Sequence, residues 1–435
     1  MTPSHKSASS GEVEHGTISA TPARCHCKGG GPTKPPLHGI RIVDFGQTII
    51  GPWAAQLLAI MGAEVIKVES HENMDTVRSY APFANDVQTP NSSALFNNLN
   101  FSKKSCTLNL KHPEGIRLAK QLVSISDIAI ENFSVGVMDR LGLAYEALRQ
   151  IKPDIIMVSC SFVGQGGPHR NHRAYGNTAQ AYSSLTALTG YLDGKPRGLG
   201  GTWADPVGGE FAALAALAAL LYRQKTGKGQ FIDVSMTEAI LTMLPEAIMD
   251  YATNDINRTC MGNRDDLMAP HGVYRCRGDD RWVAIAVSTE QEWRSLAGTL
   301  GSLPWTNDKR FSHMRERLSS QDELDSLITT WTSTRTNVQV MEALQQAGVA
   351  AGPCFDQQQL VDNHHLRERE LLIEVDHPEA GRRLGLRLPW RTSEDMHFVY
   401  GHAPLLGQHN EYVFCQLLGL SKDAMSRLVE EKVIH

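Results

Sequence analysis

The strongest candidate for chemistry in this sequence is a carboxylate in a glycine-rich segment. Asp205 follows the glycines of 198–201 and precedes Pro206, where an alanine- and leucine-rich helix is expected to start and run to Gly227. Asp before Pro is typical of an N-cap, whose side chain accepts from the first free N–H groups. The same N–H groups would lower the pKa of the carboxyl and keep it ionised as a nucleophile toward a carbonyl carbon. Both roles are compatible.

Two other glycine-containing loops could bind an anion. Residues 44–52 (DFGQTIIGP) join an expected strand to a helix start, where free N–H groups favour phosphate. The dinucleotide fingerprint G-x-G-x-x-G is absent, so a tight turn explains this loop equally well. Residues 164–168 precede the basic run 169–173 (HRNHR), which suits a phosphate, a carboxylate or a solvated surface.

Two His- and Cys-containing groups could suggest a metal. Cys25-His26-Cys27 is too tightly spaced for three ligands of one zinc, and no second ligand pair follows it. His364-His365 lacks a third ligand in phase. We expect incidental thiols, a surface helix and no metal site.

Composition limits the class of protein. The chain has 435 residues, 41% hydrophobic and 20% charged, so two or three domains with large cores are expected. A net charge of −5 gives no chain-wide basic footprint, so we expect no nucleic-acid partner. No unbroken apolar run approaches the ~20 residues of a membrane span, so we expect no membrane partner. Eight scattered cysteines without a signal peptide predict reduced thiols and a cytoplasmic protein, with mitochondrial import as the alternative.

Strands and helices alternate over most of the first 260 residues. This alternation predicts an α/β fold with a doubly wound, Rossmann-like sheet. The expected strands are 40–45, 63–68, 128–130, 155–158 and 231–234, and the expected helices include 51–61, 113–124, 145–151 and 237–251.

The pattern changes after about residue 260. We expect a disordered leader over 1–36, a large domain over 37–260 and 390–435, and a smaller α+β domain over 265–385. The smaller domain should contain a strand at 282–287, helices at 291–300, 322–330 and 338–347, and a turn or short strand at 348–353. One C-terminal helix is expected at 410–417.

Eight segments, taken in order, carry a further signal. They are 37–69 (LHGIRIVDFGQTIIGPWAAQLLAIMGAEVIKVE), 103–115 (KKSCTLNLKHPEG), 128–143 (IAIENFSVGVMDRLGL), 173–190 (RAYGNTAQAYSSLTALTG), 200–209 (GGTWADPVGG), 225–236 (KTGKGQFIDVSM), 348–354 (GVAAGPC) and 403–411 (APLLGQHNE). Together they resemble the class III CoA-transferase family, the group of formyl-CoA transferase and carnitine CoA-transferase.

The resemblance implies a CoA-transferase that moves CoA from an acyl-CoA donor to a free carboxylic acid. Asp205 matches the Asp that attacks the thioester carbonyl, which forms a mixed anhydride and then an aspartyl-CoA thioester. Coenzyme A would be a substrate, with no permanently bound cofactor. The resemblance also implies an interlocked homodimer in which each chain forms a ring threaded by its partner.

The resemblance places CoA along the loops that follow the strands of the large domain. The first loop would supply backbone contacts and later loops would supply polar and cationic side chains. The implied CoA-binding residues are Ile49, Ile50, Leu108, Lys111, Asn132, Phe133, Ser134, Arg140, His172, Arg173 and Tyr175.

Two alternatives to the transferase remain open. The first is an α-methylacyl-CoA racemase, although residues 174–179 (AYGNTA) lack the Asp of the G-H-D-I-N-Y stretch in those enzymes. The second is a non-catalytic CoA-binding partner subunit in which Asp205 only caps a helix. Formyl-CoA transferase also has Glu where this chain has Gly176, which leaves the substrate open.

The acceptor acid is a separate open question. Trp203 and Tyr175 could form an aromatic wall for a quaternary ammonium or sulfonium acid, or they could simply pack. A dicarboxylate held by Arg173 or Arg197 fits equally well.

Overall fold

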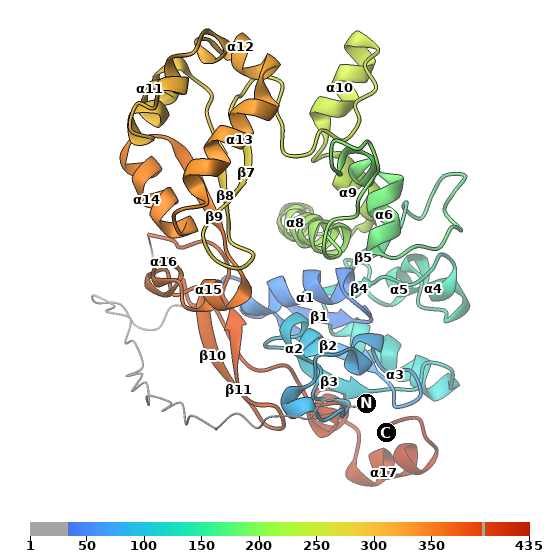
Figure 1. Cartoon of the computed structure of the whole chain (residues 1–435). Helices are drawn as coiled ribbons and strands as arrows, with labels where there is room; N and C mark the ends of the chain where they lie inside the picture. Colours follow the sequence, from blue (N-terminus) through green and yellow to red (C-terminus); the bar gives the residue numbers. More distant parts are fainter. Residues whose placement is uncertain (1–33, 394–395) are drawn as a thin grey trace, which may run out of the picture.

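Six parallel strands form the central sheet of the chain, which a computed structural model describes over residues 34–393 and 396–435 (Figure 1). The order β3-β2-β1-β4-β5-β6 reverses direction between β1 and β4. In such a sheet, ligands bind beyond the carboxyl ends of the strands at this switch point. The strands are β1 (Arg41–Asp44), β2 (Glu64–Glu69), β3 (Lys104–Thr107), β4 (Ile128–Glu131), β5 (Ile156–Ser161) and β6 (Phe231–Ser235).

Helices cover both faces of this sheet because successive strand residues point to opposite sides. Ile42 packs with α1 (Ile50–Ile60) and α8 (Ala204–Thr226), whereas its neighbour Val43 packs with α3 (Pro113–Ser124). Shorter helices complete this part of the fold: α2 (Ala94–Leu99), α4 (Val137–Arg140), α5 (Tyr145–Ile151), α6 (Gly176–Tyr182), α7 (Leu185–Leu188), α9 (Met236–Leu241) and α10 (Pro245–Asn254).

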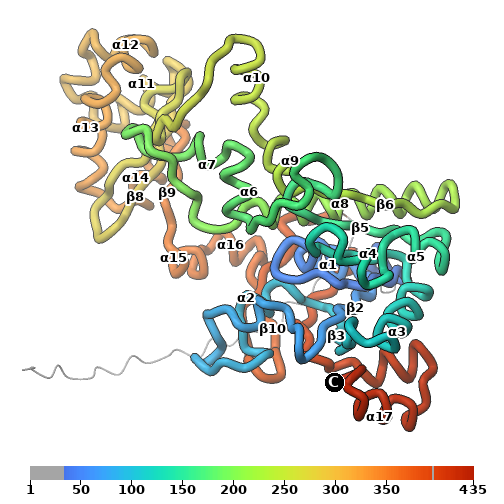
Figure 2. The backbone as a smooth tube through the Cα atoms, turned by 90° about the vertical axis from the view of Figure 1, so that its right-hand side faces the viewer, coloured from blue at the N-terminus to red at the C-terminus, as the bar shows by residue number. Residues whose placement is uncertain are grey.

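The C-terminal segment returns to the large sheet and closes its second face. A π-helix (Glu411–Leu417) and α17 (Lys422–Glu430) contribute Phe414 and Leu428 to the same core as Val43. Figure 2 shows α17 beside β3 and α3, and the hydroxyl of Thr107 donates to the carbonyl of His435 at 2.6 Å.

The crossing of α1 and α8 is unusually close because α8 carries two glycines at the contact. A Cβ atom on Gly209 would lie 2.8 Å from Trp53 Cδ1 and 2.9 Å from the carbonyl oxygen of Ile50. A Cβ on Gly208 would lie 2.7 Å from Ile50 Cδ1. This contact holds the first turn of α8 against the loop that follows β1.

Helix α8 is also long and apolar enough to cross a membrane by length and composition alone, with 44% of its apolar window buried inside the structure. The core helix of a soluble protein passes the same test. Its packing against α1 and the central sheet accounts for the apolar residues on its buried side, such as Ala212 and Ala216.

A second set of elements has its own core. The antiparallel sheet β7 (His271–Arg275), β8 (Trp282–Ala286) and β9 (Ala350–Cys354) packs against α11 (Glu290–Thr299), α13 (Gln321–Thr332) and α14 (Asn337–Gln346). Its core residues, such as Val283 and Leu324, are shared with neither face of the large sheet. The remaining elements are α12 (Met314–Ser319), α15 (Gln357–Val361), α16 (His364–Glu368) and the antiparallel pair β10 (Leu372–His377) and β11 (Gly381–Leu386).

Some expected elements were wrong or missing. The helix expected over 237–251 is broken into α9 and α10, because Pro245 lacks an N–H group and disfavours helical geometry at the residue before it. Strand β3, the β10–β11 hairpin and α17 were not expected, and the last of these makes the prediction of a single C-terminal helix wrong. The leader and Cys25–Cys27 fall mainly outside the described residues, which begin at Lys34.

Candidate active site

A cavity of about 640 Å³ lies at the carboxyl ends of β1, β4 and β5. Ile50 reaches it from the start of α1, Asn132 from the loop after β4 and Phe162 from just beyond β5. This is the switch point of the sheet, where doubly wound folds bind their ligands. The first turn of α8 closes one side of the cavity and contributes Asp205.

Asp205 is in the first turn of α8, but it is not the N-cap as the sequence suggested. Trp203 occupies the N-cap position, and Ala204 and Asp205 are the first two helical residues. Pro206 follows and has no N–H group to donate. The carboxylate therefore extends from the helix into the cavity and does not cap it. The expected end of the helix was correct: Gly227, with φ of +71°, terminates α8.

The predicted effect on the Asp205 carboxyl was also wrong in sign. Burial raises its pKa from 3.8 to about 6, and its own backbone N–H group offsets only part of this change. The residue is 7% exposed, and within residues 34–393 and 396–435 it forms no ion pair. A partly desolvated carboxylate without a cation is a better nucleophile than a solvated one, and it is still largely ionised at neutral pH.

The backbone of α6 packs directly against this carboxylate. A Cβ atom on Gly176 would lie 2.0 Å from Asp205 Oδ2 and 2.9 Å from Thr202 Cβ. Gln180, also on α6, fixes the adjoining loop because its Oε1 accepts from the Trp203 N–H group at 2.5 Å. Sterics therefore explain the glycine at position 176, because a side chain there would displace the Asp205 carboxylate.

Three arginines line the same cavity and give it a positive charge. Arg140 comes from α4, and Arg170 and Arg173 come from the basic loop before α6. All three are exposed, and none of them forms an ion pair within the described part of the chain. Unpaired guanidinium groups are suited to phosphates and carboxylates, which they bind through paired hydrogen bonds.

The structure brings together most of the residues that the resemblance implied. The cavity is lined by Ile50, Asn132, Phe133, Ser134, Arg140, His172, Arg173, Tyr175 and Asp205. Three others lie elsewhere. Ile49 precedes Ile50 in the chain, Leu108 is buried in the core beside β3, and Lys111 is exposed beyond β3. Contact of CoA with any of the implied residues stays a prediction.

The structure also bears on the two expectations for the acceptor acid. Tyr175 lines the cavity and is 77% exposed, but Trp203 is not among the lining residues, so the two do not form one aromatic wall there. Arg197 lies outside the cavity, 3.4 Å from Asp193. Of the two arginines considered for a dicarboxylate, only Arg173 is in place.

Sequence reasoning missed several lining residues. Ser161 ends β5 and Phe162 follows it, and the rule that ligands bind beyond carboxyl ends could have found both. Thr48 and Met236 reach the cavity through packing that no local pattern shows. Over the described residues, no three potential metal ligands lie together, and His364 and His365 are on an exposed helix.

Known proteins match both the sequence and the fold. Residues 37–410 match the family described as CoA-transferase family III. Succinyl-CoA--D-citramalate CoA-transferase of Chloroflexus aurantiacus is 34% identical over 92% of this chain and 98% of that protein. Formyl-CoA:oxalate CoA-transferase of a Bradyrhizobium species is 30% identical over 90% of this chain and 96% of that protein. The crystal structure of a CAIB/BAIF family protein from Brucella suis aligns with a TM-score of 0.81 and 29% identity, over 88% of this chain and 100% of that chain.

A parallel sheet with a buried carboxylate and unpaired arginines at its switch point defines an enzyme that handles an anionic substrate. The family match makes this specific: the chain belongs to the class III CoA-transferases. The resemblance inferred from eight sequence segments is thereby confirmed, and the activity is that of a CoA-transferase acting on acyl-CoA and carboxylic acid substrates.

Proposed function

We propose that the chain transfers CoA through covalent intermediates on Asp205. An Asp205 oxygen attacks the thioester carbon of the donor, the C–S bond breaks, and CoA leaves as the thiolate. The thiolate then attacks Asp205 Cγ in the mixed anhydride and releases the donor acid. The product is an aspartyl-CoA thioester.

The second half repeats these steps with the acceptor. Its carboxylate attacks Asp205 Cγ and expels the CoA thiolate, which forms a second mixed anhydride. The thiolate attacks the acceptor's acyl carbon, and the Asp205 carboxylate leaves unchanged. No proton or electron is gained or lost over the cycle, so the scheme needs no further cofactor.

One observation supports this role for Asp205 above the others. Of the described residues that line the cavity, Asp205 is the single acidic one, and it is 7% exposed. Burial limits the access of water, which would hydrolyse an anhydride or thioester. The CoA phosphates would bind the arginines at the open side, among them Arg140 and Arg173.

We further propose a dicarboxylate acceptor, with succinyl-CoA as the first donor to test. Relatives that match most of the chain are named for succinyl-CoA with D-citramalate and for succinate with glutarate. Arg170 and Arg173 are unpaired and lie on the loop next to Asp205, so one of them is available for the second carboxylate.

A transfer assay tests this proposal. Purified protein is incubated with succinyl-CoA and one acid at a time, from dicarboxylates of two to five carbons to monocarboxylates and carnitine. Formation of the acceptor's CoA thioester without net hydrolysis is expected for dicarboxylates. Transfer to carnitine or monocarboxylates alone would contradict the dicarboxylate assignment.

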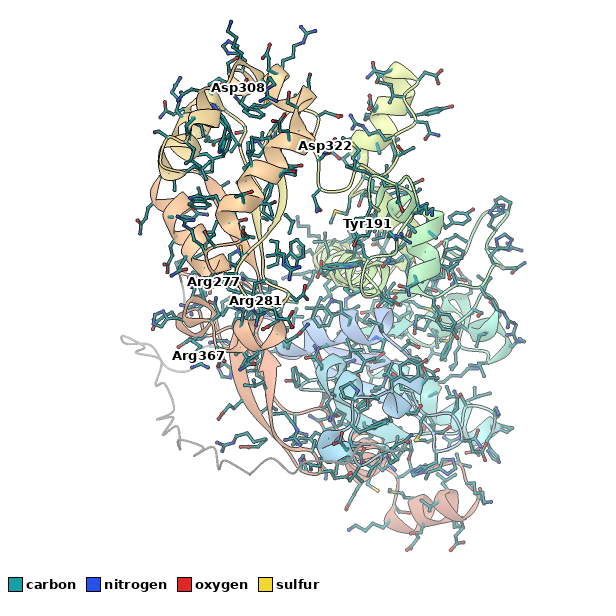
Figure 3. The ribbon with its side chains drawn as sticks, viewed as in Figure 1. Tyr191, Arg277, Arg281, Asp308, Asp322 and Arg367 are labelled. Atoms are coloured by element: carbon teal, nitrogen blue, oxygen red, sulfur yellow. The ribbon has the colours of Figure 1, made fainter. Side chains whose placement is uncertain are left out.

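We also propose a homodimer in the cytoplasm, with the second core forming a separate small domain over about 265–385. Large apolar side chains are exposed on α8, on α10 and on the segment before α8, and exposed apolar surface of this kind favours an interface. They are Tyr191 (labelled in Figure 3), Leu192, Trp203, Leu214, Leu221, Ile248, Met249 and Tyr251. Sedimentation at micromolar concentration should give twice the chain mass, and a monomer would contradict this assembly.

A further inference from the structure

Buried and half-buried side chains hold the loop after β1 by its backbone. Three consecutive N–H groups each donate to a side chain from a different part of the chain. The bonds run from Gly46 N to Asp44 Oδ1 (2.8 Å), from Gln47 N to Asn132 Oδ1 (2.7 Å) and from Thr48 N to Asp75 Oδ1 (2.8 Å).

Two carbonyl groups of the same loop are held as well. Lys67 Nζ donates to the Gly46 oxygen at 2.7 Å, and Asn132 Nδ2 donates to the Gln47 oxygen at 2.8 Å. The amide of Asn132 thus pairs with both backbone groups of Gln47, as a neighbouring strand would. We call Asp44, Lys67, Asp75 and Asn132 the loop clamp.

The charged members of the loop clamp are buried and paired. Lys67 lies 2.8 Å from Asp75, and Lys103 lies 2.8 Å from Asp44, with all four side chains fully buried. Buried ion pairs contribute little net stability, because desolvation offsets the attraction between the charges. A gain in folding stability therefore explains the loop clamp poorly. What the clamp contributes is the fixed conformation of the loop after β1.

The geometry that it imposes is strained. Thr48 has φ of +65°, which is a rare conformation for a β-branched residue. Such strain persists only where the surrounding structure enforces it, and it concentrates at functional sites. Thr48 lines the same cavity as Asp205, and Ile50, at the end of the strained loop, packs against Gly208 of α8.

We infer that the loop clamp positions the loop Gly46–Ile50 against Asp205 for CoA transfer, and that Asn132 acts on catalysis through this loop. The inference rests on the proposed function of Asp205. It also gives Asn132 a role beside the CoA contact that the resemblance implied, because the oxygen and the nitrogen of its amide each bond the backbone of Gln47.

Substitution of Asn132 tests this role. Asn132→Asp retains the acceptor for the Gln47 N–H group and loses the donor to the Gln47 carbonyl, while Asn132→Ala loses both. The matched control is Asn97→Asp, which changes another amide of the same fold, on α2 and outside the cavity. We expect kcat to fall by about ten- to a hundred-fold in the Asn132 variants, because a small displacement of the reacting groups slows the chemical step. The KM for succinyl-CoA should change by less than about three-fold. The control should keep its kcat.

Amide hydrogen exchange supplies a readout that is independent of activity. Exchange at Gln47 and Thr48 should accelerate in Asn132→Ala and stay slow in Asn97→Asp. A raised KM with unchanged kcat would show direct substrate contact and overturn the inference, and so would unchanged exchange at Gln47. Failure of the proposed function is seen separately, because wild-type protein would then form no product, and the inference would fall with it.

Discussion

The backbone of Gly176 lies against the carboxylate of Asp205, so that a Cβ atom on residue 176 would stand 2.0 Å from Asp205 Oδ2. The carboxylate occupies the space that any other residue at this position would fill. Formyl-CoA transferase, by the resemblance, has Glu there, so the same reaction must be arranged differently around the nucleophile.

Gly176→Ala should therefore impair the nucleophile. The added methyl group displaces the Asp205 carboxylate, and we expect transfer to slow by about a hundred-fold. The measurement is kcat with succinyl-CoA and the best acceptor. Gly198→Ala is the matched control, since nothing lies within 4 Å of a Cβ there. Equal activity in both variants would refute the steric role of Gly176.

Asp205→Asn should abolish transfer and stabilise the fold at neutral pH. Burial raises the carboxyl pKa from 3.8 to about 6, so the native state binds more protons than the unfolded state between these values. Stability therefore falls as the pH rises through this range, and the cost of the ionised carboxylate is complete above about pH 6. Removing the charge should increase the free energy of unfolding by about 1–3 kcal/mol at pH 7.5.

Urea unfolding of wild type and Asp205→Asn at several pH values checks this prediction. The two proteins should differ at pH 7.5 and converge near pH 4, where the wild-type carboxyl is protonated in the native state. A variant that is less stable at every pH would show that Asp205 has an unrecognised structural partner.

The rate of attack by Asp205 should depend on pH in the same range. The ionised carboxylate is the nucleophile, so single-turnover formation of the covalent intermediate should fall about ten-fold per pH unit below pH 6. Stopped-flow mixing with succinyl-CoA between pH 4.5 and 8 gives the profile. A rate that stays constant down to pH 4.5 would contradict the raised pKa.

The close crossing of α1 and α8 predicts a selective effect of alanine. Gly209→Ala places a methyl group 2.9 Å from the Ile50 carbonyl oxygen, and such overpacking costs about 1–3 kcal/mol of stability. Gly298→Ala, on α11, has open space around its Cβ and should gain about 0.5–1 kcal/mol from helix propensity. Thermal unfolding distinguishes the two, and a shift in the same direction for both would argue against close packing at Gly209.

The cavity arginines should govern affinity for CoA. Arg140→Met and Arg173→Met each remove an unpaired cation, and we expect KM for succinyl-CoA to rise about ten-fold at low salt and less at high salt. Arg117→Met, on the outer side of α3 and paired with Glu114, is the control. An unchanged KM in both cavity variants would place the phosphates elsewhere.

The sequence predicted the alternation of the large sheet well because its central strands are short apolar runs separated by longer helical segments. Strand β3 (KSCT) was missed since its polar residues are buried by partners distant in sequence, such as Asn410, which accepts from the Thr107 N–H group. The β10–β11 hairpin was missed because Arg382 and Arg383 hide its alternating pattern.

The site was predictable as a set of positions but not as a chemical environment. Glycines and Pro206 drew attention to Asp205, and the family resemblance identified its role. The direction of its pKa shift depends on burial by α6. The role of Asn132 depends on its hydrogen bonds to Gln47, which is 85 residues away in the chain. Local pattern carries no information about either of these tertiary contacts.

The central claim is that Asp205 carries CoA, and mass spectrometry after brief mixing with succinyl-CoA tests it most directly. Wild-type protein should gain the mass of a CoA thioester that hydroxylamine removes, and peptide mapping should place it on Asp205. Asp205→Ala should gain no mass under the same conditions. An adduct on another residue, or transfer by the Asp205→Ala protein at the wild-type rate, would contradict the mechanism.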